Sequence, residues 1–347
     1  MTAALHVDLD ALAANLAVVR ARVAPAAHML VVKDDAYGHG LVPVVTRAWK
    51  EQVRWFGAFD VQTGLAVRTA LGAAARIFVW QIGGLGEARD AAAEGLDLGV
   101  GDALLLEDVA AAASATGRPV RVHLKIDTGL HRNGVRPEQW AGFVARAAEL
   151  ERAGVIVVDG VWSHIAEASD AEDDQARRVF EWGWDAARGA GLTPARRHLA
   201  ASAAAFARSP FRYDLVRVGA FAYGIHPAGG PDATHLGIRP IARLVAPVVG
   251  VGDQVRIGIG ALDGLPSTLA GRVSVGTPAG ARALVSVGDE VSTVAGWDGA
   301  APGDEVVLYG PGRHGEATAT GLAEHIDTIG EEIALRVSPR LPRRHRG

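Results

Sequence analysis

The first two thirds of the chain repeat one pattern, in which a short apolar run is followed by a longer stretch with helical spacing. Strands are predicted at 28–33, 55–59, 77–81, 97–100, 119–126, 155–163, 196–199 and 214–218, and most of these segments are rich in apolar residues. The stretches between them, such as 138–153 and 174–189, place apolar residues at helical spacing. Because alternating strands and helices favour parallel pairing, and eight such units can close a barrel, we predict an α/β fold with a (β/α)8 TIM barrel.

The pattern changes near residue 230. The segment 227–232 is rich in proline and glycine and reads as a boundary. Short valine-rich runs follow, separated by Gly-Asp and Gly-Thr-Pro turns, which is typical of antiparallel β structure. One helical stretch is predicted at about 321–329. We therefore expect a barrel domain over 1–231, followed by a mainly antiparallel, β-rich C-terminal domain over 232–347.

The composition excludes several classes of function. The chain has 347 residues, a net charge of −4, 49% apolar residues and no cysteine. The charge gives no reason to expect nucleic acid as a partner, and the absence of cysteine removes disulfides, thiolate catalysis and thiolate metal sites. No run has the length of a membrane span, and the acidic start does not resemble a signal peptide. We expect a cytoplasmic protein with no membrane contact and no metal site.

One lysine stands at the end of a predicted buried strand. The strand 29–32 delivers Lys33, and the turn Gly38-His39-Gly40 follows shortly after it. Two interpretations are open. The ammonium emerges at the rim and pairs with Asp34 or Asp35, or it is desolvated and becomes the nucleophilic amine that Schiff-base chemistry requires.

Other polar residues follow the predicted strands in the same way. The carboxyl ends of barrel strands lie at one mouth, where the chemistry of such folds collects. We therefore expect these side chains to converge there: Lys33, Arg132, His164, Ser202 and Arg217.

The segment that begins at Val32 resembles the lysine motif of the alanine racemase family, which commonly reads V-K-A-N-A-Y-G-H-G. Further segments are similar to other motifs of that family in the same order along the chain. They are 6–16, 125–134, 163–166, 216–224, 303–310 and 338–343. The resemblance implies an enzyme that binds pyridoxal 5'-phosphate (PLP), acts at the Cα of an amino acid, and forms a homodimer with the active site at the subunit interface.

The resemblance also assigns roles to single residues. It implies that Lys33 holds the cofactor, that Arg217 faces its pyridine nitrogen and that His164 lies against its ring. Arg132 is implied to contact the phenolic oxygen, held by Lys125, which matches a lysine that is often carbamylated. Asp127 is expected to be structural. The phosphate cradle is implied to come from Tyr37, Ser202 and the backbone N–H groups of Gly219 and Ala220. From the residues alone, two alternatives stay open: Ser202 as a helix cap, and Arg217 as a surface partner of Asp214.

The substrate half of the site departs from the family. The family places a catalytic tyrosine, which reaches in from the partner subunit, in G-Y-A-D-G-Y-P, and the matching stretch 260–266 has Ala261 and Leu265 at the two tyrosine positions. The family's M-D pair is matched by Val287-Gly288, and its gate tyrosine by Pro339. Because an alanine side chain transfers no proton, we expect an altered second base. The loss of the three tyrosines also predicts a larger pocket.

Three functions are compatible with this pattern. The first is racemization or epimerization with a different second base, for which the candidates are His131, His164, Asp289 and a water molecule. The second is a PLP reaction that needs one base, such as decarboxylation, aldol-type cleavage or elimination. The third is a non-catalytic PLP-binding protein.

Overall fold

In the computed structural model, which describes residues 2–347, the chain forms two compact units. One unit contains residues 19–33 and 49–219, and the other contains residues 2–18, 34–48 and 220–347. The predicted domain boundary at 231/232 stays a prediction.

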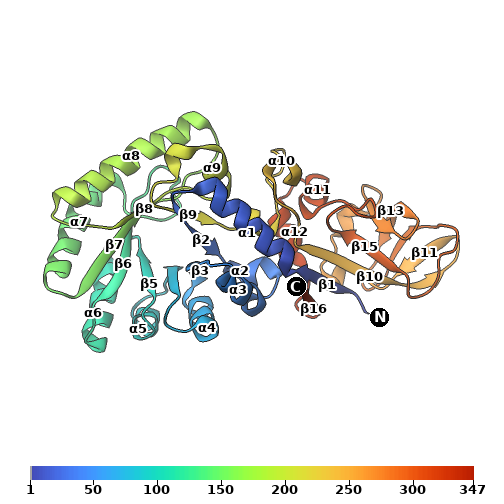
Figure 1. Ribbon diagram of the computed structural model, residues 1–347, viewed down its shortest axis with the longest axis horizontal. Helices are drawn as coiled ribbons and strands as arrows, with labels where there is room; N and C mark the ends of the chain where they lie inside the picture. Colours follow the sequence, from blue (N-terminus) through green and yellow to red (C-terminus); the bar gives the residue numbers. More distant parts are fainter. Residues whose placement is uncertain (1) are drawn as a thin grey trace. The chain divides into compact units, whose positions relative to one another are not determined.

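The first unit is a nearly closed barrel of eight parallel strands (Figure 1). The strands pair in the order β8-β7-β6-β5-β4-β3-β2-β9. Near β8 and β9, the backbone N–H of Arg217 donates to Ala200 O at 3.1 Å, so the two ends of the sheet are linked. The strands are β2 (Ala27–Val31), β3 (Trp55–Asp60), β4 (Arg76–Gln81), β5 (Asp97–Val100), β6 (Val120–Lys125), β7 (Ile156–Trp162), β8 (Arg196–His198) and β9 (Leu215–Val218).

All eight predicted strands and the barrel are confirmed. Most of these runs are apolar because barrel strands are covered on both faces, by the interior and by the helices outside. Interior packing includes a cluster of large side chains: Met29, Trp55, Phe78, Trp162 and Leu215. The outer helices are α4 (Val61–Leu71), α5 (Leu85–Ala93), α6 (Ala103–Thr116), α7 (Pro137–Arg152) and α8 (Asp170–Gly189), followed by the short α9 (Ser202–Ala207).

Polar side chains fix where these helices begin. The carboxylate of Asp60 accepts a hydrogen bond from Thr63 N, and Asp102 does the same for Leu105 N. Ser169 caps α8 by accepting from Glu172 N. Each cap pairs a backbone donor that the first turn of a helix leaves unsatisfied. α6 ends where Gly117 adopts a left-handed conformation with φ 66°.

The second unit is built around a mainly antiparallel sheet, as predicted. Its strand order is β11-β14-β13-β12-β15-β10-β1-β16. The first strand of the chain, β1, lies in this sheet, antiparallel to β10 and parallel to β16. The strands are β1 (Ala4–Asp8), β10 (Ala242–Val251), β11 (Gln254–Ile257), β12 (Ser274–Thr277), β13 (Gly280–Val287), β14 (Ser292–Ala295), β15 (Glu305–Tyr309) and β16 (Arg343–Arg346).

The Gly-Thr-Pro turn joins β12 to β13. Thr277 pairs with Gly280 in the hairpin register, and its hydroxyl donates to Gly280 O at 2.6 Å. Gly280 has φ 88°, a conformation that glycine adopts without steric cost.

The helix predicted at about 321–329 is wrong in its extent. The structure has two short helices, α11 (Ala319–Glu324) and α12 (Gly330–Arg336). The chain leaves the first helix because Asp327 takes a left-handed conformation (φ 53°) and Ile329 is extended. The remaining helices are α1 (Leu9–Val23), α3 (Leu41–Lys50) and α10 (Ala233–Leu236), while α2 (Lys33–Gly38) is a left-handed turn.

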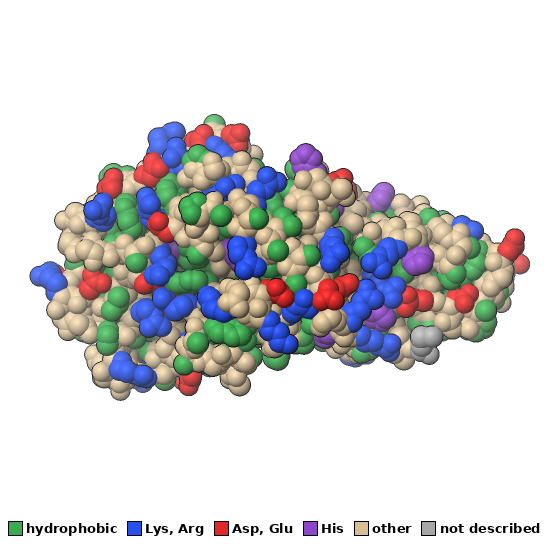
Figure 2. Space-filling view, in the orientation of Figure 1, with side chains coloured by type: hydrophobic (Ala, Val, Ile, Leu, Met, Phe, Trp, Pro, Cys, Tyr) green, Lys and Arg blue, Asp and Glu red, His purple; other side chains and the backbone are tan. Residues whose placement is uncertain are grey.

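The surface carries charges of both signs among apolar side chains on the face shown in Figure 2. Across residues 2–347, no helix combines the length and the apolar character needed to cross a membrane.

Candidate active site

Lys33 stands just past the carboxyl end of a barrel strand. β2 ends at Val31, and Val32 N still donates to Gly57 O of the neighbouring strand at 2.9 Å. The side chain of Lys33 is half-buried. The lysine therefore leaves the sheet at the mouth of the barrel, where the sequence predicted it.

The turn after Lys33 is left-handed, which the sequence did not reveal. Asp34, Asp35, Ala36 and Tyr37 have φ values of 53°, 54°, 55° and 56°. For residues with a Cβ this conformation costs roughly 1 kcal/mol each or more, so the surrounding structure must hold it in place. Asp35 contributes: its carboxylate accepts from Leu41 N at 2.7 Å and its carbonyl from Gly40 N at 3.0 Å.

Tyr37 lies in the second unit and packs on another tyrosine. Its ring centroid is 4.7 Å from that of Tyr223, which also stacks with His39 at 5.2 Å. Burial raises the pKa of the Tyr37 hydroxyl far above its ordinary range. At neutral pH, Tyr37 therefore offers a neutral hydroxyl.

Arg217 is a buried guanidinium in the barrel. It lies within β9 rather than after it, and 5% of its surface is exposed. Its Nη1 donates to His198 O at 3.0 Å, and its Nη2 donates to Ser163 O at 2.8 Å and Leu199 O at 2.9 Å. The pairing of Arg217 with Asp214 is therefore wrong, since Asp214 pairs with Arg197 at 3.0 Å.

Two histidine rings also face this guanidinium. Arg217 Nη2 is 3.2 Å from His164 Nδ1, and Nη1 is 3.1 Å from His198 Nδ1. Burial, together with the charge of Arg132, lowers the pKa of Arg217 to about 9. The guanidinium is charged at neutral pH and is held rigidly by carbonyl oxygens and ring nitrogens.

Several of the predicted residues act electrostatically on His164. Burial lowers the pKa of His164 well below its ordinary value, and the charges that lower it further belong to Arg217, Arg132, Lys125 and Lys33. Every charged group that shifts this pKa is a cation. A site with this excess of positive charge suits an anionic ligand, and PLP carries a phosphate and a phenolate.

Lys125 is buried beneath an aromatic ring in the same group. Its Nζ lies 4.3 Å from the centroid of the Trp162 ring, and 6% of the residue is exposed. Burial lowers its pKa to about 8, and the charges of Arg217 and Arg132 act in the same direction. A substantial fraction of this amine is therefore neutral near pH 7.5.

The neighbouring segment 127–132 is shaped by Asp127. Its carboxylate accepts from Gly129 N, from His131 N and from His131 Nδ1. Burial opposes ionisation of Asp127, but these hydrogen bonds outweigh it and lower the pKa. Asp127 therefore has the structural role that was expected, and it ties up the ring of His131.

Ser202 is not a helix cap. α9 begins at Ser202 itself, with Ala201 at the cap position and no side-chain cap bond. The free N–H of Ala204 is satisfied by Glu167 Oε1 at 3.0 Å. The hydroxyl of Ser202 instead accepts from Gly219 N at 3.1 Å, so a hydroxyl and a backbone N–H from the proposed phosphate cradle lie together. Ala220 follows at the start of a short 3-10 helix, Ala220–Tyr223.

The loop matched to the family's tyrosine motif lies in the second unit. Ala261 is exposed at the start of a 3-10 turn, and Leu265 is 3% exposed. The loop packs on the segment after β13, because Ala261 N donates to Gly288 O and Leu262 N to Asp289 O. Asp289, one of the candidate bases, thus lies beside the position where the family has its tyrosine.

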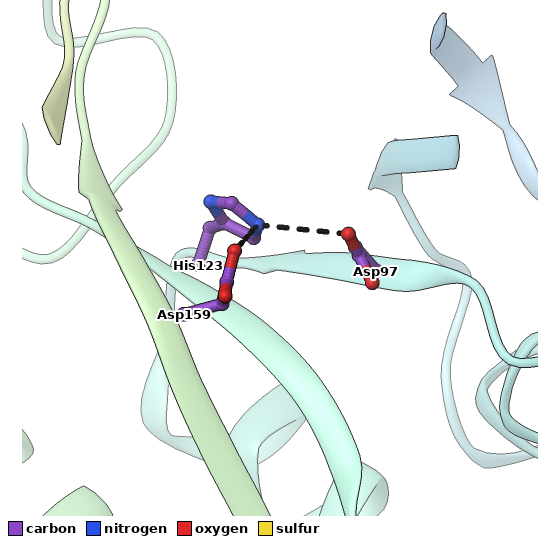
Figure 3. A group of neighbouring side chains, drawn as sticks. All are labelled: Asp97, His123 and Asp159. Carbon is purple, nitrogen blue, oxygen red and sulfur yellow. Dashed lines mark ion pairs between the residues drawn. The ribbon is translucent and has the colours of Figure 1, made fainter. Parts of the chain in front are cut away.

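The site also includes polar residues that the sequence analysis missed. His198 contacts Arg217 directly, and behind it in the barrel lies a group of His123, Asp97 and Asp159 (Figure 3). His123 and His198 lie on separate strands and form no spacing pattern, and only a polar side chain at a fully buried position marks each of them.

Comparisons of the sequence and the structure with known proteins identify one family. The model for "Alanine racemase, N-terminal domain" matches residues 7–227, and the model for "Alanine racemase, C-terminal domain" matches residues 254–345. The chain is 35% identical to alanine racemase of Thermobifida fusca over 99% of its length and 97% of the relative's. It is 38% identical to alanine racemase of Beutenbergia cavernae, over 98% and 97%. The crystal structure of alanine racemase from Streptomyces lavendulae superposes with a TM-score of 0.95 at 33% identity, covering 100% of this chain and 97% of that one.

Proposed function

Because the chain belongs to the alanine racemase family, we propose that it is a PLP-dependent isomerase that acts at the Cα of an amino acid. Enzymes of this family use PLP. The observation that carries the proposal is the buried guanidinium of Arg217, 3.2 Å from His164 Nδ1, in the same barrel as Lys33, which follows the end of β2.

The residues present fit the parts of the cofactor. Lys33 would hold it covalently, and Ser202 with Gly219 N, Ala220 N and Tyr37 would hold its phosphate. Arg217 would face the pyridine nitrogen, and His164 the ring. Arg132, supported by Lys125, would contact the phenolic oxygen.

The bound cofactor supplies an electron sink for a carbanion at Cα. Arg217 would limit the strength of that sink, because its charge would keep a facing ring nitrogen unprotonated. A weak sink favours removal and return of one proton over chemistry that needs a long-lived carbanion. Lys33 would move that proton on one face of Cα.

The second proton position is the point at which this chain differs. Ala261 removes the tyrosine that the family uses on the opposite face. Of the candidate replacements, His131 is engaged by Asp127 and His164 faces Arg217, whereas Asp289 lies beside Ala261. We infer a racemase or epimerase with an altered second base, and a pocket enlarged by the loss of the family's tyrosines at Ala261, Leu265 and Pro339.

One observation favours a second candidate function. Because Ala261 is exposed and carries no acid or base, a reaction that needs only Lys33 remains compatible with the site. Decarboxylation, aldol-type cleavage and elimination are of this kind. A non-catalytic PLP-binding protein is a third.

We also propose a homodimer in the cytoplasm. The dimer is supported by the loop at Ala261, which in the family completes the partner's site, and the cytoplasm by the absence of cysteine. An amino acid is the expected partner, with neither nucleic acid nor a membrane.

Reduction with borohydride tests the cofactor site. The protein purified with PLP should carry the reduced cofactor on Lys33, found by peptide mass spectrometry, and Lys33→Ala should lose it. The exposed Lys50 provides a control position. Reductive labelling of Lys125 or Lys50 instead of Lys33 would contradict the assignment.

A further inference from the structure

A second group of buried polar side chains lies in the barrel, on strands β5 to β8. Asp97, His123 and His198 are fully buried, and the side chain of Asp159 is 13% exposed. Figure 3 shows His123 with one ring nitrogen directed toward both carboxylates. Among residues 2–347, this nitrogen, Nε2, has no hydrogen-bond partner within normal geometry.

The chain of contacts from Arg217 to this group has a fixed direction. A guanidinium has only donors, so His198 Nδ1, at 3.1 Å from Arg217 Nη1, must accept. The proton of neutral His198 is then on Nε2, which lies 2.9 Å from His123 Nδ1. His123 Nδ1 must accept in turn, so its proton is on Nε2, 3.5 Å from Asp159 Oδ2 and 4.0 Å from Asp97 Oδ2.

Packing holds both rings in this arrangement. The His198 ring stacks on Trp162 with an interplanar angle of 3°, and the His123 ring packs on Phe78 at 4.9 Å. Gly160 leaves room for His123, since a Cβ there would lie 2.4 Å from Nδ1. Burial lowers the pKa of His123 to about 4 and that of His198 well below its ordinary value, so both rings are neutral at pH 7.

The two carboxylates are the negative end of this chain rather than a metal site. Asp97 accepts from Arg76 at 2.6 Å and from Arg121 at 2.5 Å. Asp159 accepts from Arg196 at 2.6 Å and from Arg76 at 3.1 Å. Three guanidiniums therefore occupy the carboxylate oxygens, and a divalent cation would lie among three positive charges. A proton on His123 Nε2 points toward the two carboxylates, 3.5 Å and 4.0 Å away, and displaces none of the three guanidiniums.

We propose that Asp97 and Asp159, acting through His123 and His198, form a positioning relay that fixes the orientation of Arg217. The carboxylates favour the Nε2-protonated form of His123, which in turn favours the same form of His198. His198 then presents a lone pair to Arg217. The opposite form of His198 would set an N–H against the guanidinium, so the relay holds Arg217 in one orientation. The link to the cofactor rests on the proposed function.

The first test measures which ring nitrogens of His123 and His198 carry a proton, and it needs no cofactor. Long-range 1H–15N NMR of histidine-labelled protein should show His123 and His198 neutral and protonated on Nε2 from pH 6 to 8. The signals are assigned by their loss in His123→Phe and His198→Phe. A proton on Nδ1 of either ring, or an imidazolium in this range, would overturn the relay.

The second test measures PLP affinity by equilibrium dialysis. His198→Phe should lower it about 10-fold to 100-fold, the range for losing a hydrogen bond to a charged group, and His123→Phe about 10-fold. His123→Asn should recover most of the second loss, because its amide oxygen can accept from His198 Nε2. Phe78→Leu is the control, since Phe78 packs on both rings and carries no hydrogen-bonding atom.

The two tests separate the relay from the proposed function. A parent protein that binds no PLP, with both rings protonated on Nε2, would refute the proposed function and leave the relay intact. Equal PLP affinity in His123→Phe and Phe78→Leu would refute the relay while the parent's cofactor site stands.

Discussion

His28, on β2 and away from the candidate site, should make the stability of the protein depend on pH. Burial, with a smaller effect of the Arg20 charge, lowers its pKa from 6.5 to about 4, and its Nε2 has no hydrogen-bond partner within residues 2–347. The unfolded chain therefore binds a proton on His28 at a pH where the folded chain does not. This contribution is fully present above pH 6.5 and is lost as the pH falls toward 4.

The expected size follows from the two pKa values. Between pH 7 and pH 5, the proton taken up by the unfolded chain lowers the free energy of unfolding by about 2 kcal/mol for this one histidine. His28→Leu removes the group, so the variant should lose about 2 kcal/mol less than the parent over the same interval. At pH 7 the substitution should be close to neutral, because it also removes an unpaired buried nitrogen.

Urea unfolding followed by circular dichroism at pH 7 and pH 5 measures this difference. His235→Leu is the matched control, since the His235 ring is exposed to water in the folded chain as it is in the unfolded chain. Equal loss of stability in the parent and in His28→Leu would refute the reasoning, because it would mean that His28 binds its proton in the folded barrel.

Two further predictions concern the site. Arg217→Glu should let the pyridine nitrogen of bound PLP take a proton, and a long-wavelength absorption band absent from the parent should appear when an amino acid is added; an unchanged spectrum with PLP bound would show that Arg217 does not face the ring. Lys125, with a pKa of about 8, should form a carbamate with 13C-bicarbonate at pH 8, seen as a 13C NMR signal that Lys125→Arg removes and Lys50→Arg keeps. Persistence of the signal in Lys125→Arg would place the carbamate elsewhere.

The barrel could be predicted from the sequence because most of its strands are short apolar runs bounded by turn residues; β8, with the sequence Arg-Arg-His, is the exception. Such a run is covered on both faces, so its composition alone distinguishes it from the helices between. The location of β1 could not be predicted in this way, since its partners β10 and β16 are more than 200 residues away and its apolar pattern suits either sheet.

The residues proposed to hold the cofactor were predicted from motifs, whereas the buried histidines behind Arg217 were not predicted. Lys33 and Arg217 occur in segments long enough to be compared with a family. His123 lies between two apolar residues in β6 and His198 follows two arginines in β8, and their connection exists only through tertiary packing. The left-handed turn at 34–37 was hidden for a related reason, because Ala36 and Tyr37 have no preference for that conformation.

The central claim is that Lys33 remains as a base at Cα while the opposite face has lost its tyrosine. The direct measurement is exchange at Cα in deuterated water, over a panel of single enantiomers, with configuration read by chiral chromatography and deuterium by mass spectrometry. We predict that deuterium enters with retained configuration well in excess of inversion, and that Ala261→Tyr raises inversion relative to exchange. Rapid racemization of alanine by the parent protein, with inversion equal to exchange in both directions, would contradict the claim and show that another group, such as Asp289, already does the work of the tyrosine.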